Sequence, residues 1–245
     1  MENLFLVNLA FKAFALYLIQ YCSGLLVERK GVKVNYTRKI NHFCLFIVPI
    51  YLDKVFVFKQ TFGLFILGMA LVIVSLAIYI RPIRERCSVI NTMFLSFDRP
   101  EDRPHTLAWL STQIIAGFLV IIPMIMLYAH YELLDLMFIP ILINGIGDGL
   151  AEPVGVRFGR HRYSVHALFT RKIYVRSLEG SACVFITGAA VIAIHYRAFT
   201  SFEFLLALIF LPILMTLAEA FSPHTWDTPF LFLVGYLALL GITRL

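Results

Sequence analysis

Charged residues are scarce in this chain of 245 residues. Only 15% of the residues are charged and 60% are apolar, whereas soluble domains average about a quarter charged and about half apolar. So little charge excludes an ordinary soluble domain. It also argues against nucleic acid as a partner: 21 Lys and Arg against 15 Asp and Glu leave a net charge of +6, but so apolar a chain lacks the water-facing basic surface that nucleic-acid binding needs.

Several familiar motifs are also missing. The four cysteines form no C-x-x-C pair, so neither a zinc site nor a disulfide framework is predicted. There is no P-loop of the form G-x-x-x-x-G-K-[ST], and no G-x-G-x-x-G follows a predicted strand. Internal repeats, linkers and low-complexity tracts are absent as well. We therefore predict one integral membrane domain over residues 1–245.

Long apolar runs dominate what is present. A helix needs about 17 to 25 apolar residues to cross a bilayer, and three runs meet that length: 4–27, 62–80 and 107–129. Five further runs are shorter or interrupted: 43–58, 133–147, 180–196, 204–218 and 228–243. The sequence thus predicts an all-α integral membrane protein with about eight transmembrane helices, some of them short or broken.

The basic residues are distributed unevenly between the loops. The odd-numbered loops hold sixteen Lys and Arg, whereas the even-numbered loops hold three, namely Lys54, Lys59 and Arg197. Cytoplasmic loops carry the excess of Lys and Arg in membrane proteins, so we expect the basic loops inside the cell and both termini outside. One of the basic loops contains a mixed-charge, proline-stiffened segment at 97–104, which we predict to be a solvated turn.

The fifth apolar run ends in an unusual segment. Residues 144–153 read Asn-Gly-Ile-Gly-Asp-Gly-Leu-Ala-Glu-Pro, so Asp148 directly follows the apolar run 133–147. A carboxylate at depth costs roughly 2.5 to 3.5 kcal/mol and is normally kept for a function. Asp148 and Glu152 are four residues apart, so on a continuous helix they share one face and can hold a hard divalent cation.

The glycines of this segment allow a second interpretation. Gly145 and Gly149 are spaced G-x-x-x-G, as are Gly155 and Gly159. Small residues at that spacing let helices approach closely. Helix packing alone, however, does not require Asp148.

A cluster of cations follows directly. Guanidinium groups bind phosphate oxygens in pairs, and glycines let backbone N–H groups approach them, so this cluster indicates a site for a metal-bound polyphosphate. The alternative is contact with lipid headgroups. The cations concerned are Arg157, Arg160, His161, Arg162, Arg171, Lys172 and Arg176.

Two acidic positions border this region. Glu179 lies near the predicted start of the sixth span, where a helix-capping role is the ordinary expectation. A segment from Glu219 to Asp227 joins the last two spans without Lys or Arg. Its acidic groups either complete a metal site or belong to a polar turn.

Together these motifs resemble a family. Residues 147–159 (GDGLAEPVGVRFG) and 176–181 (RSLEGS) are similar to the polytopic CTP-dependent lipid kinases that act on phytol, farnesol, dolichol or diacylglycerol. The resemblance extends to Arg38-Lys39-x-x-His42 and to the segment from Glu219 to Pro229. Thr228 stands where many members carry Asn, and Arg176-Ser177 stands where many carry Lys-Thr.

The resemblance implies the transfer of the γ-phosphoryl group of CTP to a membrane-dissolved alcohol, with Mg²⁺ as cofactor and a catalytic region mainly in residues 133–245. Asp148 would be the central carboxylate, with Glu152 beside it, and Asp227 would be a third metal ligand. The nucleotide and its phosphates would be bound by Arg38, Lys39, Gly147, Gly149, Arg157, Arg162, Arg176, Glu179, Gly180 and Ser181. His42 and Glu219 would lie nearby.

Two other functions remain open at this point. A membrane cytidylyltransferase, a class distantly similar to these kinases, would use the same nucleotide but attack its α-phosphorus. A transporter would use the broken fifth span as an unwound substrate-binding helix. The identity of the lipid and the oligomeric state do not follow from the sequence.

Overall fold

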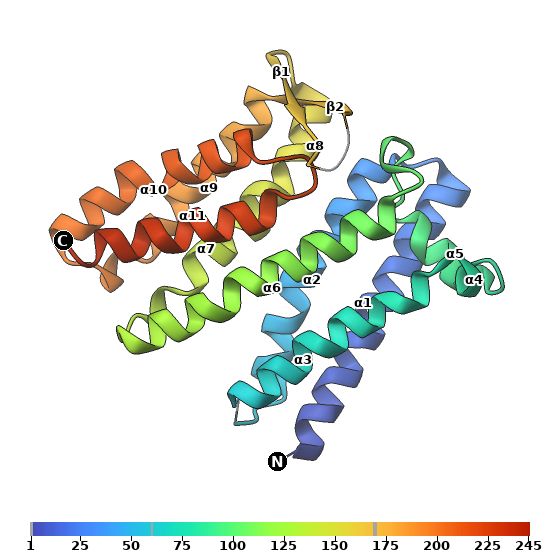
Figure 1. Cartoon of the computed structure of the whole chain (residues 1–245), viewed down its shortest axis with the longest axis horizontal. Coiled ribbons are helices and arrows are strands. Elements are labelled where there is room, and N and C mark those ends of the chain that lie inside the picture. The colour runs from blue at the N-terminus through green and yellow to red at the C-terminus, as the bar shows by residue number, and fades with distance from the viewer. Residues whose placement is uncertain (1, 60, 169–170) are drawn as a thin grey trace. The chain divides into compact units, whose positions relative to one another are not determined.

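The computed structural model describes residues 2–59, 61–168 and 171–245 and is predominantly helical, as predicted. Its contacts divide the chain into two compact units, Met1–Thr112 and Gln113–Leu245. The elements are labelled in Figure 1. In the first unit they are α1 (Glu2–Lys30), α2 (Val34–Val55), α3 (Phe62–Ser75), η1 (Leu76–Tyr79), α4 (Arg81–Arg84), α5 (Ser88–Leu95), η2 (Pro100–Asp102) and the start of α6 (Thr106–His130).

The second unit takes up the rest of α6. Its other elements are η3 (Leu134–Leu136), α7 (Phe138–Leu142), η4 (Ile143–Asp148), α8 (Gly149–Phe158), β1 (Arg162–His166), β2 (Ile173–Ser177), α9 (Leu178–Ile194), η5 (Tyr196–Ala198), α10 (Ser201–Phe221) and α11 (Asp227–Ile242).

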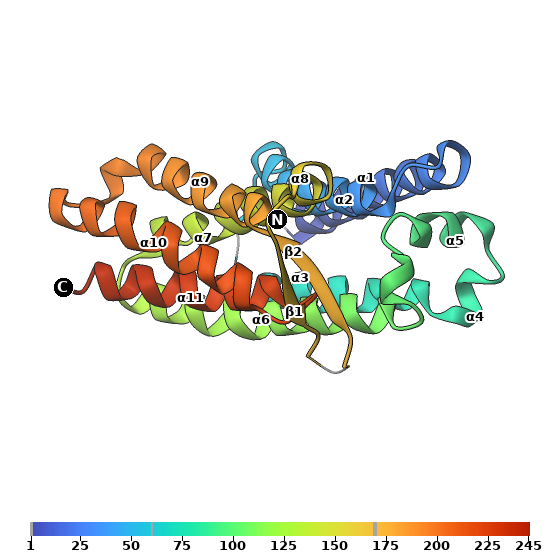
Figure 2. The same ribbon diagram turned by 90° about the horizontal axis from the view of Figure 1, so that it is seen from above.

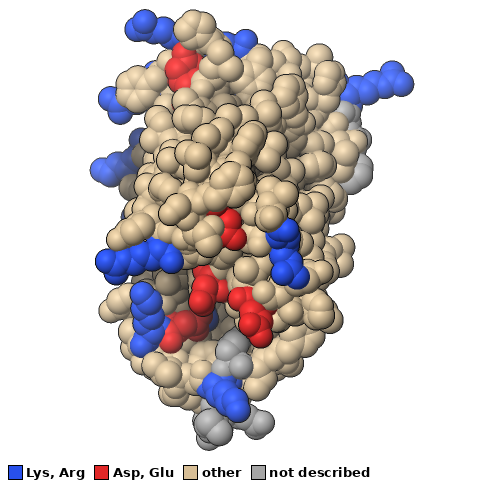
Figure 3. Space-filling view, turned by 90° about the vertical axis from the view of Figure 1, so that its left-hand side faces the viewer, with Lys and Arg blue, Asp and Glu red and all other residues tan. Residues whose placement is uncertain are grey.

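Five helices are long and apolar enough to cross a membrane: Leu4–Lys30, Phe62–Tyr79, Thr106–His130, Leu134–Phe158 and Ser201–Phe221. α9 and α11 are apolar but shorter. Residues 43–58 fall largely within α2, which is helical but not among the five. Most of the face seen in Figure 3 carries uncharged side chains. All eight predicted runs are therefore helical, and five of them have the length and composition of a membrane span.

The first unit is built on the pairing of α1 with α2 and α5. Asn8 on α1 donates to the Leu52 carbonyl and to the Asp53 carboxylate, both at 3.1 Å. The start of α1 thus lies against the end of α2, so the two helices are antiparallel. Gly24 lets α1 approach α5, because a Cβ at this position would lie 1.8 Å from the Thr92 carbonyl oxygen.

The segment 97–104 differs from the solvated turn that we expected. Arg99 donates to Asp102 at 2.7 Å, and each of these side chains is only 5% exposed. Asp98 accepts from Arg103 at 2.7 Å and from Thr106 at 2.6 Å. The expectation of a solvated turn was therefore wrong for Asp98, Arg99 and Asp102, because each of the two buried carboxylates has a cation within five residues of it. The other charged and proline residues of the segment are exposed, as expected: Pro100, Glu101, Arg103 and Pro104. We call residues 98–106 the ionic corner.

In the second unit α10 packs against both α9 and α11. Two caps explain where α9 and α10 begin. The Ser177 hydroxyl accepts from the Gly180 N–H at the start of α9, and Thr200 and Glu203 form a capping box at the start of α10. Tyr128 on α6 donates to the Tyr236 carbonyl on α11 at 2.7 Å. The two caps are local signals, and they fix the starts of α9 and α10 near the candidate site.

Candidate functional site

The predicted break in the fifth span is a continuous helix with a π-helical insert. α7, η4 and α8 run on from one another, and the six-residue π-helical segment η4 ends at Asp148. Asp148 therefore lies inside the helix Leu134–Phe158 rather than at the end of a run 133–147. Its side chain is buried, with the residue 3% exposed. π-Helical turns are rare and occur often at functional sites, and continuity through Pro153 places Asp148 and Glu152 one turn apart.

Several glycines of this segment bring it close to α9. A Cβ on Gly147 would lie 2.9 Å from the Val184 Cα, and one on Gly180 would lie 2.6 Å from the Ala151 carbonyl oxygen. Gly155 and Gly159 pack against the Ser177 side chain in the same way. Close packing thus accounts for these four glycines, of which Gly155 and Gly159 form one of the two G-x-x-x-G pairs. It gives no role to the buried Asp148.

The basic segment after α8 contains a β-hairpin that the sequence analysis did not predict. β1 and β2 are antiparallel, with Tyr163 opposite Arg176 and Ser164 opposite Val175. The hairpin projects from α8 and α9 past the start of α11 (Figure 2). The run Ile173–Ser177 is rich in β-branched and aromatic residues, which is the strand signal that could have identified it.

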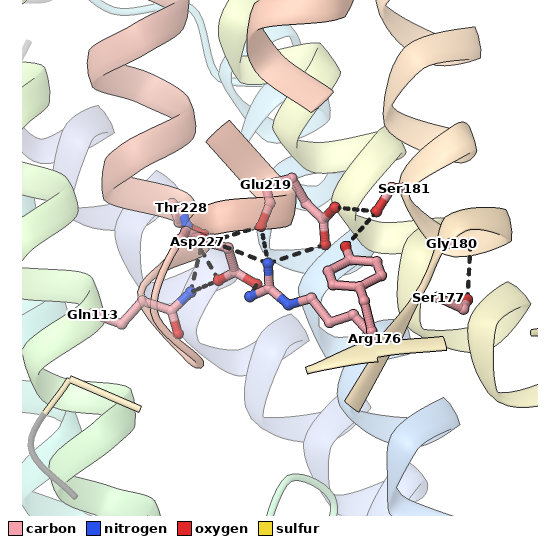
Figure 4. A network of polar contacts seen from close by, with 10 residues as sticks. Gln113, Arg176, Ser177, Gly180, Ser181, Glu219, Asp227 and Thr228 are labelled. Carbon is pink, nitrogen blue, oxygen red and sulfur yellow. Dashed lines mark hydrogen bonds and ion pairs between the residues drawn. The ribbon is translucent and has the colours of Figure 1, made fainter. Parts of the chain in front are cut away.

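Arg176 links the hairpin to α10 and α11 (Figure 4). One of its terminal nitrogens contacts the Glu219 carbonyl, the Glu219 carboxylate at 3.3 Å and the Ser222 hydroxyl at 3.2 Å. The other lies 3.8 Å from the Asp227 carboxylate. Arg176, predicted to bind phosphate, is in this conformation held by protein oxygens from two helices and the loop between them.

Glu219 interacts with several polar side chains besides Arg176. Its carboxylate accepts from the Ser181 hydroxyl at 2.7 Å, and Ser181 is also 2.7 Å from the Tyr163 hydroxyl. Glu219 interacts electrostatically with both Asp148 and Asp227. The residue is 4% exposed. Side chains from β1, β2, α9, α10 and α11 therefore contact one another in a largely buried polar cluster. We call these residues, together with Asp148 on η4, which interacts electrostatically with Glu219, the Glu219 cluster.

Burial raises the pKa of Tyr163 above its ordinary value of 10, and the nearby Glu219 charge acts in the same direction. Hydrogen bonding to Ser181 and the charge of Arg176 oppose that rise. The Tyr163 hydroxyl therefore stays protonated at neutral pH and can donate to Ser181.

Asp227 is held from a second side by Gln113. The Gln113 amide donates to the Thr228 hydroxyl at 2.9 Å and to the Asp227 carboxylate at 3.3 Å. Thr228 also donates its backbone N–H to Asp227 at 3.1 Å. Thr228 thus helps to orient Asp227. Sequence reasoning missed Gln113, because its partners lie more than 110 residues away.

The loop between α10 and α11 packs on the hairpin. The His224 ring stacks on the Tyr174 ring at 3.4 Å between centroids, and the His224 N–H donates to the His166 carbonyl at 3.0 Å. Thr225 has a φ of 69°, which is unusual for a β-branched residue and is typical of functional sites. The two loops predicted to share one side of the membrane therefore contact each other.

Other predicted residues lie around the cluster or apart from it. Arg157 and Arg162 are exposed, and Glu152 is half-buried. Glu179 contacts the His161 ring at 2.9 Å. Gly149 is buried at the start of α8. Arg38, Lys39 and His42 are in the first unit on α2, where Lys39 is buried and His42 packs on Phe46.

A metal site was tested against the donors present. Within residues 2–59, 61–168 and 171–245, no group of three or more His, Cys, Asp or Glu side chains is arranged to hold a metal ion. Mg²⁺, however, is usually bound by one or two carboxylates together with substrate phosphates and water. Asp148 and Glu152 fit that smaller donor set, whereas Asp227 is engaged with Arg176, Gln113 and Thr228.

Comparisons with known proteins add no relative: no family model, curated protein or solved structure matches this chain.

Proposed function

We propose that this protein is a membrane enzyme that transfers the γ-phosphoryl group of CTP to the hydroxyl of a lipid alcohol. The observation that carries the proposal is the Glu219 cluster, in which buried Glu219 interacts with the buried carboxylate of Asp148 and the half-buried carboxylate of Asp227. CTP and the alcohol are inferred from the resemblance to CTP-dependent lipid kinases, whose motifs supply these same residues.

The surrounding residues support phosphoryl transfer. The lipid hydroxyl oxygen would attack the γ-phosphorus, the bond to the bridging oxygen would break, and CDP would leave. Asp148 would orient the hydroxyl and accept its proton, a role that buried carboxylates serve well. Arg157, exposed on α8, would bind phosphate oxygens with its guanidinium group.

Mg²⁺ would be held by Asp148 and Glu152. Bound there with the triphosphate, it would supply neutralisation of the charge that develops on the phosphate oxygens. Arg176 would keep Glu219 and Asp227 fixed, and Gln113 would hold Asp227 from its other side.

Transport receives less support than catalysis. An unwound substrate-binding helix is the feature that suggested a transporter, but residues Leu134–Phe158 run as one helix. We place the active site on the cytoplasmic side with both termini outside, on the basis of the loop charges.

Labelled CTP tests the proposal. Purified protein in lipid vesicles is given γ-labelled or α-labelled CTP, Mg²⁺ and a phytol, polyprenol or diacylglycerol substrate. We expect the γ-label in the lipid and release of CDP, and we expect a chelator to abolish both. A parallel reaction with added ATP measures whether ATP competes with CTP. Label from the α-position with release of pyrophosphate would identify a cytidylyltransferase, and no labelled lipid from any of these alcohols would overturn the kinase.

A further inference from the structure

The two faces of the hairpin differ sharply. The inward face carries Tyr163, Val165, Tyr174 and Arg176, all buried or half-buried. The outward face carries five exposed residues: Arg162, Ser164, His166, Ile173 and Val175. Strand alternation explains this division, because neighbouring side chains point to opposite sides of a sheet.

Two apolar side chains stand on the outward face with little cover. Ile173 is 61% exposed and Val175 is 63% exposed. The pairing places them opposite His166 and Ser164, so they line one strand of the same face. The inward face of the same hairpin buries its apolar side chains Val165 and Tyr174, whereas Ile173 and Val175 remain exposed.

The position of this face along the chain indicates what the partner is. β2 ends at Ser177 and the apolar helix α9 begins at Leu178, which is itself 60% exposed. A five-residue strand spans only about 17 Å, so the outward face stays close to the point where α9 begins. Phe158, at the end of α8 just before the hairpin, is 58% exposed.

Charge points to the same partner. Arg162 lies on the outward face and Arg171 lies two residues before the start of β2, and both are exposed. The acidic residue of this region, Glu179, is turned toward His161. Apolar side chains flanked by cations match the boundary between acyl chains and anionic headgroups.

We propose that the outward face of the hairpin binds the surface of an anionic membrane. Ile173 and Val175 enter the headgroup region, and Arg162 and Arg171 pair with lipid phosphates. The inward face of the same strands stays on the Glu219 cluster. This inference stands on the hairpin and the apolar helices and does not depend on the proposed kinase activity.

The test uses the full chain in nanodiscs. The four cysteines are replaced by alanine, Val175→Cys is labelled with an environment-sensitive fluorophore, and quenching by brominated phosphatidylcholine is compared with quenching by aqueous iodide. The nanodiscs contain phosphatidylcholine alone or with phosphatidylglycerol. A matched label at Ser201→Cys, the first residue of α10, serves as the control.

We expect the lipid quencher to reach position 175 more effectively than iodide, and phosphatidylglycerol to increase the difference at 175 but not at 201. Arg162→Gln with Arg171→Gln should weaken the phosphatidylglycerol effect by about fivefold per residue, whereas Arg197→Gln should not change it. Thermal melting of each variant checks that it is folded.

Two results would overturn the proposal. Iodide quenching at position 175 equal to that of the free fluorophore conjugate in both nanodiscs would mean that the face is in water. A label that iodide reaches in nanodiscs but not in native membranes would mean that a protein covers the face instead of lipid.

Discussion

The ionic corner of the first unit and the Glu219 cluster of the second are both buried and both contain arginines paired with carboxylates. In the corner, the partners are three to eight residues apart along the chain: Arg99 with Asp102, and Asp98 with Arg103 and Thr106. In the cluster, Arg176 reaches Glu219 at 43 residues and Ser222 at 46.

This difference in separation suggests a difference in role. A short segment that pairs its own charges shapes a turn at little cost in chain entropy. Bringing six elements together around carboxylates has a larger cost in chain entropy. Clusters of ionisable groups of this kind are frequent at active sites. We therefore expect the corner to support the fold and the cluster to support activity.

Asp148→Asn tests most strongly whether the Glu219 cluster supports activity. The substitution keeps the shape of the side chain and removes its charge, so turnover in the labelled-CTP assay should fall by roughly 10²-fold or more. Insertion and melting temperature should stay near those of the parent protein. Glu152→Gln should have a milder effect. An Asp148→Asn protein with near-normal turnover would leave the glycine-rich segment with a packing role alone.

Arg176→Gln should lower both stability and activity. Removing one partner of a buried ion pair costs about 3 kcal/mol, because Glu219 and Asp227 would lose their shared cation. Asp102→Asn in the ionic corner should give a similar loss of stability with the turnover per folded molecule unchanged. Thermal melting in detergent and single-turnover rates separate the two outcomes; equal losses of turnover in both variants would contradict the division of roles.

Gly147→Ala should destabilise the protein by about 1 to 3 kcal/mol. The new methyl group would meet the Val184 Cα at 2.9 Å, and backbone cannot move aside easily. Gly68→Ala is the matched control, because it too lies in an apolar helix and has nothing within 4 Å of the added Cβ. Denaturation in mixed micelles measures both. A Gly147→Ala protein as stable as Gly68→Ala would argue against close contact between η4 and α9.

The smallest effect is expected from Tyr163 at alkaline pH. Because its pKa is raised in the folded protein, its contribution to stability is fully present below its ordinary value of 10 and is lost as the pH rises above that value. Melting temperatures between pH 8 and pH 11 should therefore fall less steeply for Tyr163→Phe than for the parent protein. Parallel curves would show that burial and the Glu219 charge do not keep the hydroxyl protonated in the folded protein.

The sequence by itself determined the apolar helices and singled out Asp148 as a carboxylate next to one of them. Apolar runs of sufficient length and the carboxylate at Asp148 are local signals, because helix formation depends on neighbours three and four residues away. The same local information predicted that Asp148 and Glu152 share a helix face. It also left helix packing open as the role of the glycines.

Only the tertiary structure decided how the cluster is built. Arg176 lies on a strand, its guanidinium is held by Glu219, Ser222 and Asp227, and Gln113 joins Asp227 across more than 110 residues. The charge of the 97–104 segment was also visible in the sequence, but its burial was not. Contacts between distant segments depend on how whole helices pack, and no local pattern of residue types records which side chains that packing brings together.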